Sequence, residues 1–169
     1  MNLLPALIFV SQFALSLSVI EEIGGFHDLN GVRGFDSPRD NKCVFGRLQS
    51  VGITGKLTCN GKPASDVSVK LYDHDVPDFD DLMDKGTSGE DGRFSLKGTE
   101  CETTEIDPLL KIYHDCNDNL PCKIKVPIQI PSRYVTVGDE TPDEIYDAGT
   151  IELGREHYGQ SRDCLRLDG

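Results

Sequence analysis

One short stretch of the chain, IYHDCNDNLPC at residues 112–122, concentrates side chains that could do chemistry. It contains His114, Asp115, Cys116, Asp118 and Cys122. Imidazole, thiolate and carboxylate groups at close spacing build zinc centres and catalytic dyads. A zinc centre takes four ligands, commonly in close pairs, and no second pair lies nearby in the sequence. We therefore predict a Cys116–Cys122 disulfide that staples the connection between two strands, with a zinc centre as the alternative.

A second stretch, DHDVPDFDDLMD at residues 73–84, is rich in aspartate and lacks Lys and Arg. Clustered carboxylates suit hard cations such as Ca²⁺. The segment departs from an EF-hand loop in three ways. Pro77 replaces the third ligand, Asp84 stands at position twelve in place of Glu, and the turn glycine is absent. We expect no tight metal binding here. We interpret the segment as a loop that binds a partner or, weakly, a cation. Its candidate residues are Asp73, Asp75, Asp78, Asp80 and Asp81; the other interpretation is a solvated loop that protects strand edges.

Residues that could catalyse a reaction form no recognisable arrangement. The Gly-x-Ser-x-Gly motif of hydrolases is missing from the sequence. Six cysteines can pair as three disulfides, which would leave no cysteine nucleophile. We expect no enzymatic activity and no cofactor.

The N-terminal segment indicates export. Residues 1–18 carry no charged side chain, form an apolar stretch too short to span a bilayer, and end in Ser16-Leu17-Ser18. We predict a signal peptide over 1–18 and a secreted protein, found extracellularly or at the cell surface. Six cysteines then suggest three disulfides. The formal net charge of −12 argues against nucleic-acid binding.

The elements that must position these residues are strands. Residues 19–50 lack any hydrophobic period, which predicts an irregular N-terminal arm. From Val51 the apolar residues alternate, and the segments 51–59, 66–73, 92–98, 109–114, 123–130 and 147–153 are expected to be strands, with a short one near 82–88. We predict an all-β fold over residues 51–167: a seven-stranded Greek-key β-sandwich.

Several motifs in this order resemble a known family. GKLTCNGKPASDVSVKLYD, GTSGEDGRFSL, IDPLLKIYHDC, VPIQIPSRYVT, YDAGTIEL and the late RDC are similar to the nematode transthyretin-like family of small secreted proteins. The resemblance runs from about Gln49 to Cys164 and implies a transthyretin-type (prealbumin-like) sandwich without established enzymatic activity. Hydroxyisourate hydrolases share that fold. Their C-terminal Tyr-Arg-Gly-Ser is absent here, and His27, His74, His114 and His157 stand in other contexts.

The cysteines divide into two groups by this resemblance. Cys59, Cys116, Cys122 and Cys164 match the family pattern, whereas Cys43 and Cys101 are additional. We predict a Cys59–Cys164 bridge that ties down the C-terminal tail, although the sequence leaves other pairings open. The two additional cysteines are expected to pair as Cys43–Cys101, with intermolecular bridges in a covalent dimer as the alternative.

Together these features predict a binding protein. The first hypothesis is a recognition module for extracellular or cell-surface proteins, which uses exposed loops on a rigid scaffold. The alternative is a carrier of a small apolar ligand or lipid, which would need an apolar pocket. A hydroxyisourate-type hydrolase is the third hypothesis.

Overall fold

The computed structural model describes residues 43–75 and 80–164, which belong to one compact unit at residues 37–169. The predicted signal peptide and most of the predicted arm lie outside the described residues. Within the described part, no helix is long and apolar enough to cross a membrane.

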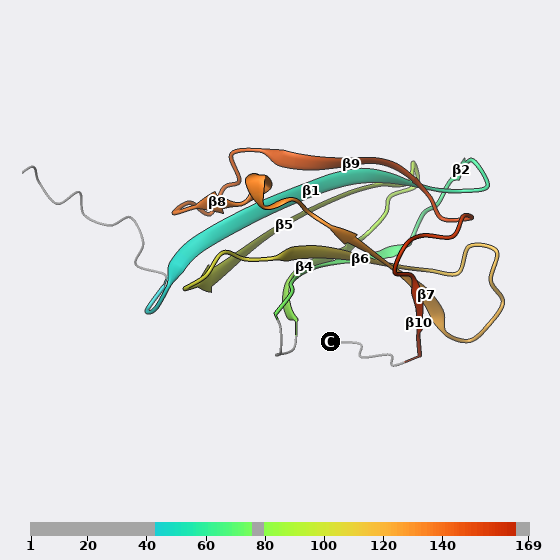
Figure 1. Cartoon of the computed structure of the whole chain (residues 1–169). Helices are drawn as coiled ribbons and strands as arrows, with labels where there is room; N and C mark the ends of the chain where they lie inside the picture. Colours follow the sequence, from blue (N-terminus) through green and yellow to red (C-terminus); the bar gives the residue numbers. More distant parts are fainter. Residues whose placement is uncertain (1–42, 76–79, 165–169) are drawn as a thin grey trace, which may run out of the picture. The chain divides into compact units, whose positions relative to one another are not determined.

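Two β-sheets lie face to face (Figure 1). The first sheet contains β1 (Arg47–Cys59), β2 (Lys62–Pro63), β5 (Arg93–Glu102), β8 (Thr136–Val137) and β9 (Ile145–Glu152). The second has the order β10 (Ser161–Asp163), β7 (Lys123–Gln129), β6 (Pro108–His114), β3 (Ser68–Asp73) and β4 (Asp81–Thr87). A 3₁₀ helix, η1 (Ser132–Tyr134), precedes β8. The expected all-β sandwich is therefore confirmed.

β1 is the central strand of the first sheet. It pairs antiparallel with β2, β5 and β8 and parallel with β9. All pairings of the second sheet are antiparallel. The strands follow the alternation of the sequence, because every second side chain points into the space between the sheets. The core so formed includes Ile53, Leu57, Leu71, Leu110, Ile112 and Val126, all fully buried. Burying each such side chain contributes about 1.5–3 kcal/mol.

The observed strands extend the predicted ones. β1 begins at Arg47, within the segment that the sequence assigns to the arm. The short strands β2, β8 and β10 were not predicted. Pro127 lies on β7 beyond the three residues that pair with β10, so its missing N–H leaves no gap in that ladder. Asn60 and Gly61 form the turn after β1 with φ angles of 55° and 75°, as the Asn-Gly pair predicts.

Two of the disulfides differ from the predicted pairs. The structure joins Cys122 to Cys164 and Cys59 to Cys116, in place of Cys116–Cys122 and Cys59–Cys164. The unpredicted strand β10 is the reason: it sets Asp163 opposite Lys123, so the next residues along the ladder face each other with Cα atoms 4.6 Å apart.

The Cys59–Cys116 bridge connects the two sheets at one end of the sandwich. Cys59 ends β1 and Cys116 follows β6, with their Cα atoms 5.8 Å apart. Beside the bridge, the Asn60 and Asn117 side-chain amides donate to each other at 2.8 and 3.0 Å. A bridge from Cys59 to the C-terminal tail is excluded here because β10 holds that tail against β7.

The third bridge, Cys43–Cys101, lies at the opposite end of β1, with Cα atoms 5.6 Å apart. It fastens the residues before β1 to the end of β5. Gly46 makes this close approach feasible, because its φ is +86° and a Cβ atom there would lie 2.7 Å from the Glu102 carbonyl carbon. Within this fastened loop Val44 and Phe45 are exposed.

Asp84 of β4 links the two sheets along one side of the sandwich. Its carboxylate accepts a hydrogen bond from the Lys97 N–H of β5 at 2.9 Å, and from the Lys85 N–H at 2.8 Å. β4 thereby covers part of the β5 edge, which would otherwise present an unpaired N–H.

Candidate functional site

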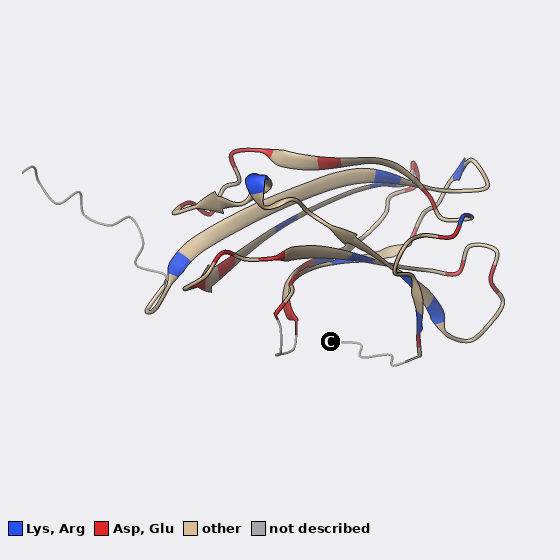
Figure 2. Cartoon of the chain, in the orientation of Figure 1, with Lys and Arg blue, Asp and Glu red and all other residues tan. Residues whose placement is uncertain are grey.

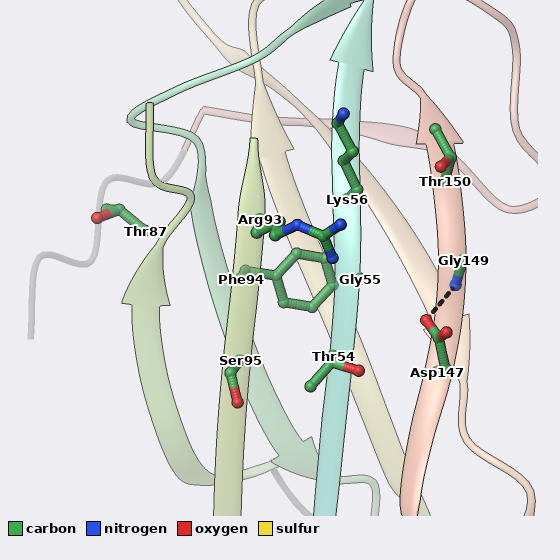
Figure 3. Close-up of a pocket in the computed structure, with 10 residues that line it drawn as sticks. All are labelled: Thr54, Gly55, Lys56, Thr87, Arg93, Phe94, Ser95, Asp147, Gly149 and Thr150. Atoms are coloured by element: carbon green, nitrogen blue, oxygen red, sulfur yellow. Dashed lines mark hydrogen bonds between the residues drawn. The ribbon is translucent and has the colours of Figure 1, made fainter. Parts of the chain in front are cut away.

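A pocket of about 600 Å³ lies on the first sheet where β5, β1 and β9 run side by side. Two rows of residues cross these strands in register. Lys56 pairs with Arg93 of β5 and Thr150 of β9; Thr54 pairs with Ser95 and Asp147. Figure 3 shows these side chains along the three strands, with the buried Phe94 ring beside Gly55. We call this hollow the Lys56–Arg93 pocket.

A bulge gives the pocket its shape. Between the Thr54–Asp147 pair and the Lys56–Thr150 pair, β9 contains one residue more than β1. Gly149 absorbs the extra residue with φ +67°, and its N–H donates to the Asp147 carboxylate at 2.8 Å (Figure 3). Opposite, a Cβ atom on Gly55 would lie 2.8 Å from the Phe94 ring, so the glycine leaves room for that aromatic side chain. Local bulging thus opens a hollow in an otherwise regular sheet.

The chemistry of the pocket favours an anion. Lys56 and Arg93 supply two positive charges, and Thr54, Ser95 and Thr150 supply hydroxyl donors. Arg93 also forms an exposed ion pair with Asp91 at 3.4 Å, which is worth little in water. The pocket also contains the Asp147 carboxylate, and one of its oxygens accepts the Gly149 N–H. A carboxylate, phosphate or sulfate group can therefore be held here by charge-assisted hydrogen bonds.

The side chains of residues 112–122 have structural roles. His114 is buried, and its Nδ1 accepts the Cys116 N–H at 3.2 Å, while Nε2 has no hydrogen-bond partner. Burial lowers the pKa of His114, and nearby His157 lowers it further. Asp118 receives two hydrogen bonds from the Arg162 guanidinium, at 2.6 and 3.0 Å, which lowers the pKa of this carboxyl. These hydrogen bonds hold the ends of β6, β7 and β10 together.

The aspartate segment divides between different environments. Asp80 binds Lys111 and also contacts His74 Nδ1 at 2.6 Å. Burial acts to raise the pKa of Asp80, but these two partners lower it. Asp81 is exposed on β4, and Asp78 lies outside the described residues. The five predicted residues therefore do not form one ligand loop in the described structure.

Asp73 and Asp75 instead meet Glu102 of β5. One carboxylate oxygen from each of the three lies within 4.8 Å of the others, a spacing that a cation could bridge. Asp73 is 2% exposed, and its carboxylate accepts the Asp107 N–H at 2.6 Å. Burial raises the pKa of Asp73; the Asp107 hydrogen bond opposes this, and the charges of Asp75 and Glu102 reinforce it. The sequence could not reveal this cluster, because Glu102 lies on another strand.

Comparison with known proteins places the chain in a family. The family model TTR-52, Transthyretin-like family, matches residues 54–131. Transthyretin-like protein 5 of Caenorhabditis elegans is 52% identical over 124 residues, which cover 72% of this chain and 88% of that protein. The chain belongs to the transthyretin-like family.

Other similarities add little about function. Transthyretin-like protein 33 of Caenorhabditis elegans is 46% identical over 127 residues, covering 74% of this chain and 87% of the relative. A solved 9R-lipoxygenase from Cyanothece PCC8801 aligns with 62% of this chain and 16% of its own, at 22% identity and a TM-score of 0.37. A likeness this distant supports no argument. The relatives are named as transthyretin-like proteins, not as enzymes.

Sequence reasoning missed the pocket of this transthyretin-like sandwich. Lys56 and Arg93 are far apart in the chain and belong to two separate predicted strands, 51–59 and 92–98. Only the antiparallel register of β1 and β5 makes them direct neighbours. Gly149 in DAGTIEL was the available signal, because a glycine inside an alternating strand often marks a bulge.

Proposed function

We propose that this transthyretin-like protein is a secreted recognition protein that binds an extracellular or cell-surface partner protein. The Lys56–Arg93 pocket would hold an acidic group of that partner. The three disulfides suit an oxidising compartment, and the apolar N-terminal residues suit export. The protein would act by binding and without catalysis.

The arrangement of Lys56, Arg93 and the hydroxyl groups of Thr54, Ser95 and Thr150 around one hollow carries this proposal. The lining residues come mainly from three hydrogen-bonded strands of one sheet, so the donors are positioned before a ligand arrives. Such preorganisation reduces the entropy lost on binding. Arg93 and Lys56, which pair directly across β5 and β1, also favour a partner with a protruding Asp, Glu or chain-terminal carboxylate.

The composition of the pocket argues against the carrier hypothesis. Sites for small apolar ligands are lined mainly by hydrophobic and aromatic side chains. Here Phe94 is the one aromatic residue among the lining residues, and most of the others carry hydroxyl or charged groups. The pocket therefore suits an acidic ligand group better than a lipid chain.

Site-specific crosslinking tests the proposal. A photo-reactive amino acid replaces Ser95, which is exposed at the pocket. The purified protein is then incubated with extracellular fluid and intact cells. We expect a crosslinked partner protein whose capture is lost when Lys56→Glu and Arg93→Glu are combined. The matched control is Lys62→Glu with Arg155→Glu, an equal charge change at exposed residues outside the pocket.

Three other outcomes would reject this function. Capture that is equal in the pocket and control variants would show that the pocket is not used. A lipid or small apolar molecule that co-purifies, detected by native mass spectrometry, would support the carrier hypothesis. Hydrolysis of hydroxyisourate by the purified protein would support the enzyme hypothesis.

A further inference from the structure

His114 places a titratable side chain in the interior, at one end of the sandwich. β6 alternates buried and partly exposed residues, and His114 ends this strand on the buried side, with 2% of its surface exposed. Residues 115–122, which we call the β6–β7 turn, follow directly and contain one cysteine of each of two disulfides, Cys59–Cys116 and Cys122–Cys164. Figure 2 shows acidic residues on this turn and basic residues at the start of β7. The imidazole therefore lies beside a turn that is tied covalently to two other segments.

The hydrogen bonds of His114 fit only the neutral imidazole. Nδ1 accepts the Cys116 N–H at 3.2 Å, so the single proton of the neutral ring must be on Nε2. Nε2 is buried and has no hydrogen-bond partner in the part of the chain that the structure describes. A second proton would have to bind Nδ1, where it would face the Cys116 N–H, donor against donor. Protonation therefore breaks this hydrogen bond and leaves a buried charge without an acceptor.

The surroundings of His114 also oppose its protonation. Among the described residues, the charged groups that act on it most strongly are His157 after β9, Lys123 of β7, and Asp115 and Asp118 of the β6–β7 turn. Asp115 is paired with Lys123, and Asp118 with an arginine of β10. β1 and β3 contribute the disulfide-bonded Cys59 and Ser68 here, neither of which titrates. Burial first and His157 second lower the pKa of His114 below 6.5.

The β6–β7 turn is attached by bonds of different strength. The two disulfides are covalent, and Asp118 accepts two hydrogen bonds from the Arg162 guanidinium, at 2.6 and 3.0 Å. The bond from the Cys116 N–H to His114 joins two neutral groups and is weaker than a hydrogen bond between charged groups. Loss of this bond therefore loosens the turn locally. The disulfides keep the turn attached, so that it can close again.

We infer that His114 is an acid-sensitive latch: protonation of its imidazole releases the Cys116 N–H and shifts the β6–β7 turn toward an open state. This device goes beyond the proposed recognition of a partner protein and does not involve the Lys56–Arg93 pocket. In the open turn the imidazole reaches water and regains its ordinary pKa of 6.5, whereas the closed turn lowers that pKa. The closed state is therefore fully stable above pH 6.5 and loses stability as the pH falls through 6.5 toward the lowered pKa. An acidic compartment would thus meet a different turn surface from a neutral one.

Amide hydrogen exchange, followed by NMR on the mature protein with its disulfides intact, tests the latch. Protection factors, which remove the intrinsic pH dependence of exchange, are compared at about pH 7.5 and about pH 5.5. We expect the protection of the Cys116 N–H to fall by up to about tenfold at the lower pH, one unit below 6.5. The Leu57 N–H, which donates to the Gly92 carbonyl within the first sheet, should keep its protection.

Two variants assign the effect to the imidazole. In His114→Asn the side-chain amide oxygen can replace Nδ1 as the acceptor but takes up no proton in this pH range, so the pH dependence at Cys116 should disappear. The matched control is His74→Asn, the same substitution at a histidine that follows the far end of β3, and it should keep the pH dependence.

Several outcomes would overturn the latch. Equal protection of the Cys116 N–H at both pH values would do so, as would an equal fall in His114→Asn. A fall of the same size at Leu57 would show loss of the whole fold in place of local opening. If His114→Asn does not fold, an NMR titration of the unmodified protein decides. The His114 ring and the Cys116 N–H should then change together below pH 6.5, whereas a ring that takes up its proton while the Cys116 N–H stays protected rejects the latch.

Discussion

The Oε2 atom of Glu152 accepts a hydrogen bond from the Gly61 N–H at 2.8 Å, so the end of β9 holds the turn between β1 and β2. The other carboxylate oxygen, Oε1, accepts the Asn60 and Gly154 N–H groups at 2.7 and 2.9 Å. Thr58 Oγ1 also donates to the carboxylate, at 3.0 Å. One side chain thereby connects the turn after β1 to the residues that follow β9, near the Cys59–Cys116 bridge.

This contact predicts a specific acid sensitivity. The backbone N–H groups of Gly61 and Gly154 lower the pKa of Glu152 from 4.5 to about 2. Because the folded pKa lies below the unfolded value, the stabilisation is complete above pH 4.5 and is lost as the pH falls toward 2. Urea unfolding across that range should show a steeper loss for the unmodified protein than for Glu152→Gln. Parallel curves would contradict this role for the carboxylate.

Asp73→Asn should stabilise the protein at neutral pH. The amide oxygen of Asn can still accept the Asp107 N–H, while the buried charge and its repulsion with Asp75 and Glu102 disappear. Because the pKa of Asp73 in the folded protein is raised above the unfolded value of 3.8, its ionisation destabilises the folded state at higher pH. The stability gained from Asp73→Asn should therefore shrink as the pH falls through the folded pKa of Asp73 toward 3.8. We expect an increase of a few degrees in melting temperature, on the order of 1 kcal/mol. A Ca²⁺-dependent stabilisation of the unmodified protein that Asp73→Asn abolishes would instead reveal a cation site.

Gly92→Ala should cost more stability than Gly61→Ala. Both glycines have positive φ, 80° and 75°, so both substitutions carry a backbone strain of about 1–2 kcal/mol. A Cβ atom on Gly92 would also lie 2.3 Å from the Leu57 carbonyl oxygen, whereas nothing lies within 4 Å of one on Gly61. Chemical denaturation of the two variants gives the difference directly. Equal losses would show that the Leu57 segment can move aside.

Peptide mapping under non-reducing conditions should recover the pairs Cys43–Cys101, Cys59–Cys116 and Cys122–Cys164 from monomeric protein. Replacing both cysteines of any one pair with Ser should cost about 4 kcal/mol, because the closed loops differ little in length. A peptide that links Cys116 to Cys122, or two copies of Cys43, would overturn this pattern.

The sequence predicts the sandwich well because alternation is a local signal. Val51, Ile53 and Leu57 lie on one face of β1 as the pattern requires, and Asn60-Gly61 marks the turn. The pairs that meet across strands depend on register, which single segments do not encode. Lys56 beside Arg93 and Cys122 beside Cys164 are examples, the second missed because β10 is only three residues long.

The disulfide arrangement also has a consequence for how the chain matures. Cys116 and Cys122 are near neighbours in the sequence, but each is bonded to a distant residue. Closing a short loop costs less entropy than closing a long one, so a Cys116–Cys122 bridge forms readily in a chain that is still unfolded. We therefore expect oxidative folding to pass through a species with a Cys116–Cys122 bridge, whose rearrangement by thiol–disulfide exchange would limit the folding rate.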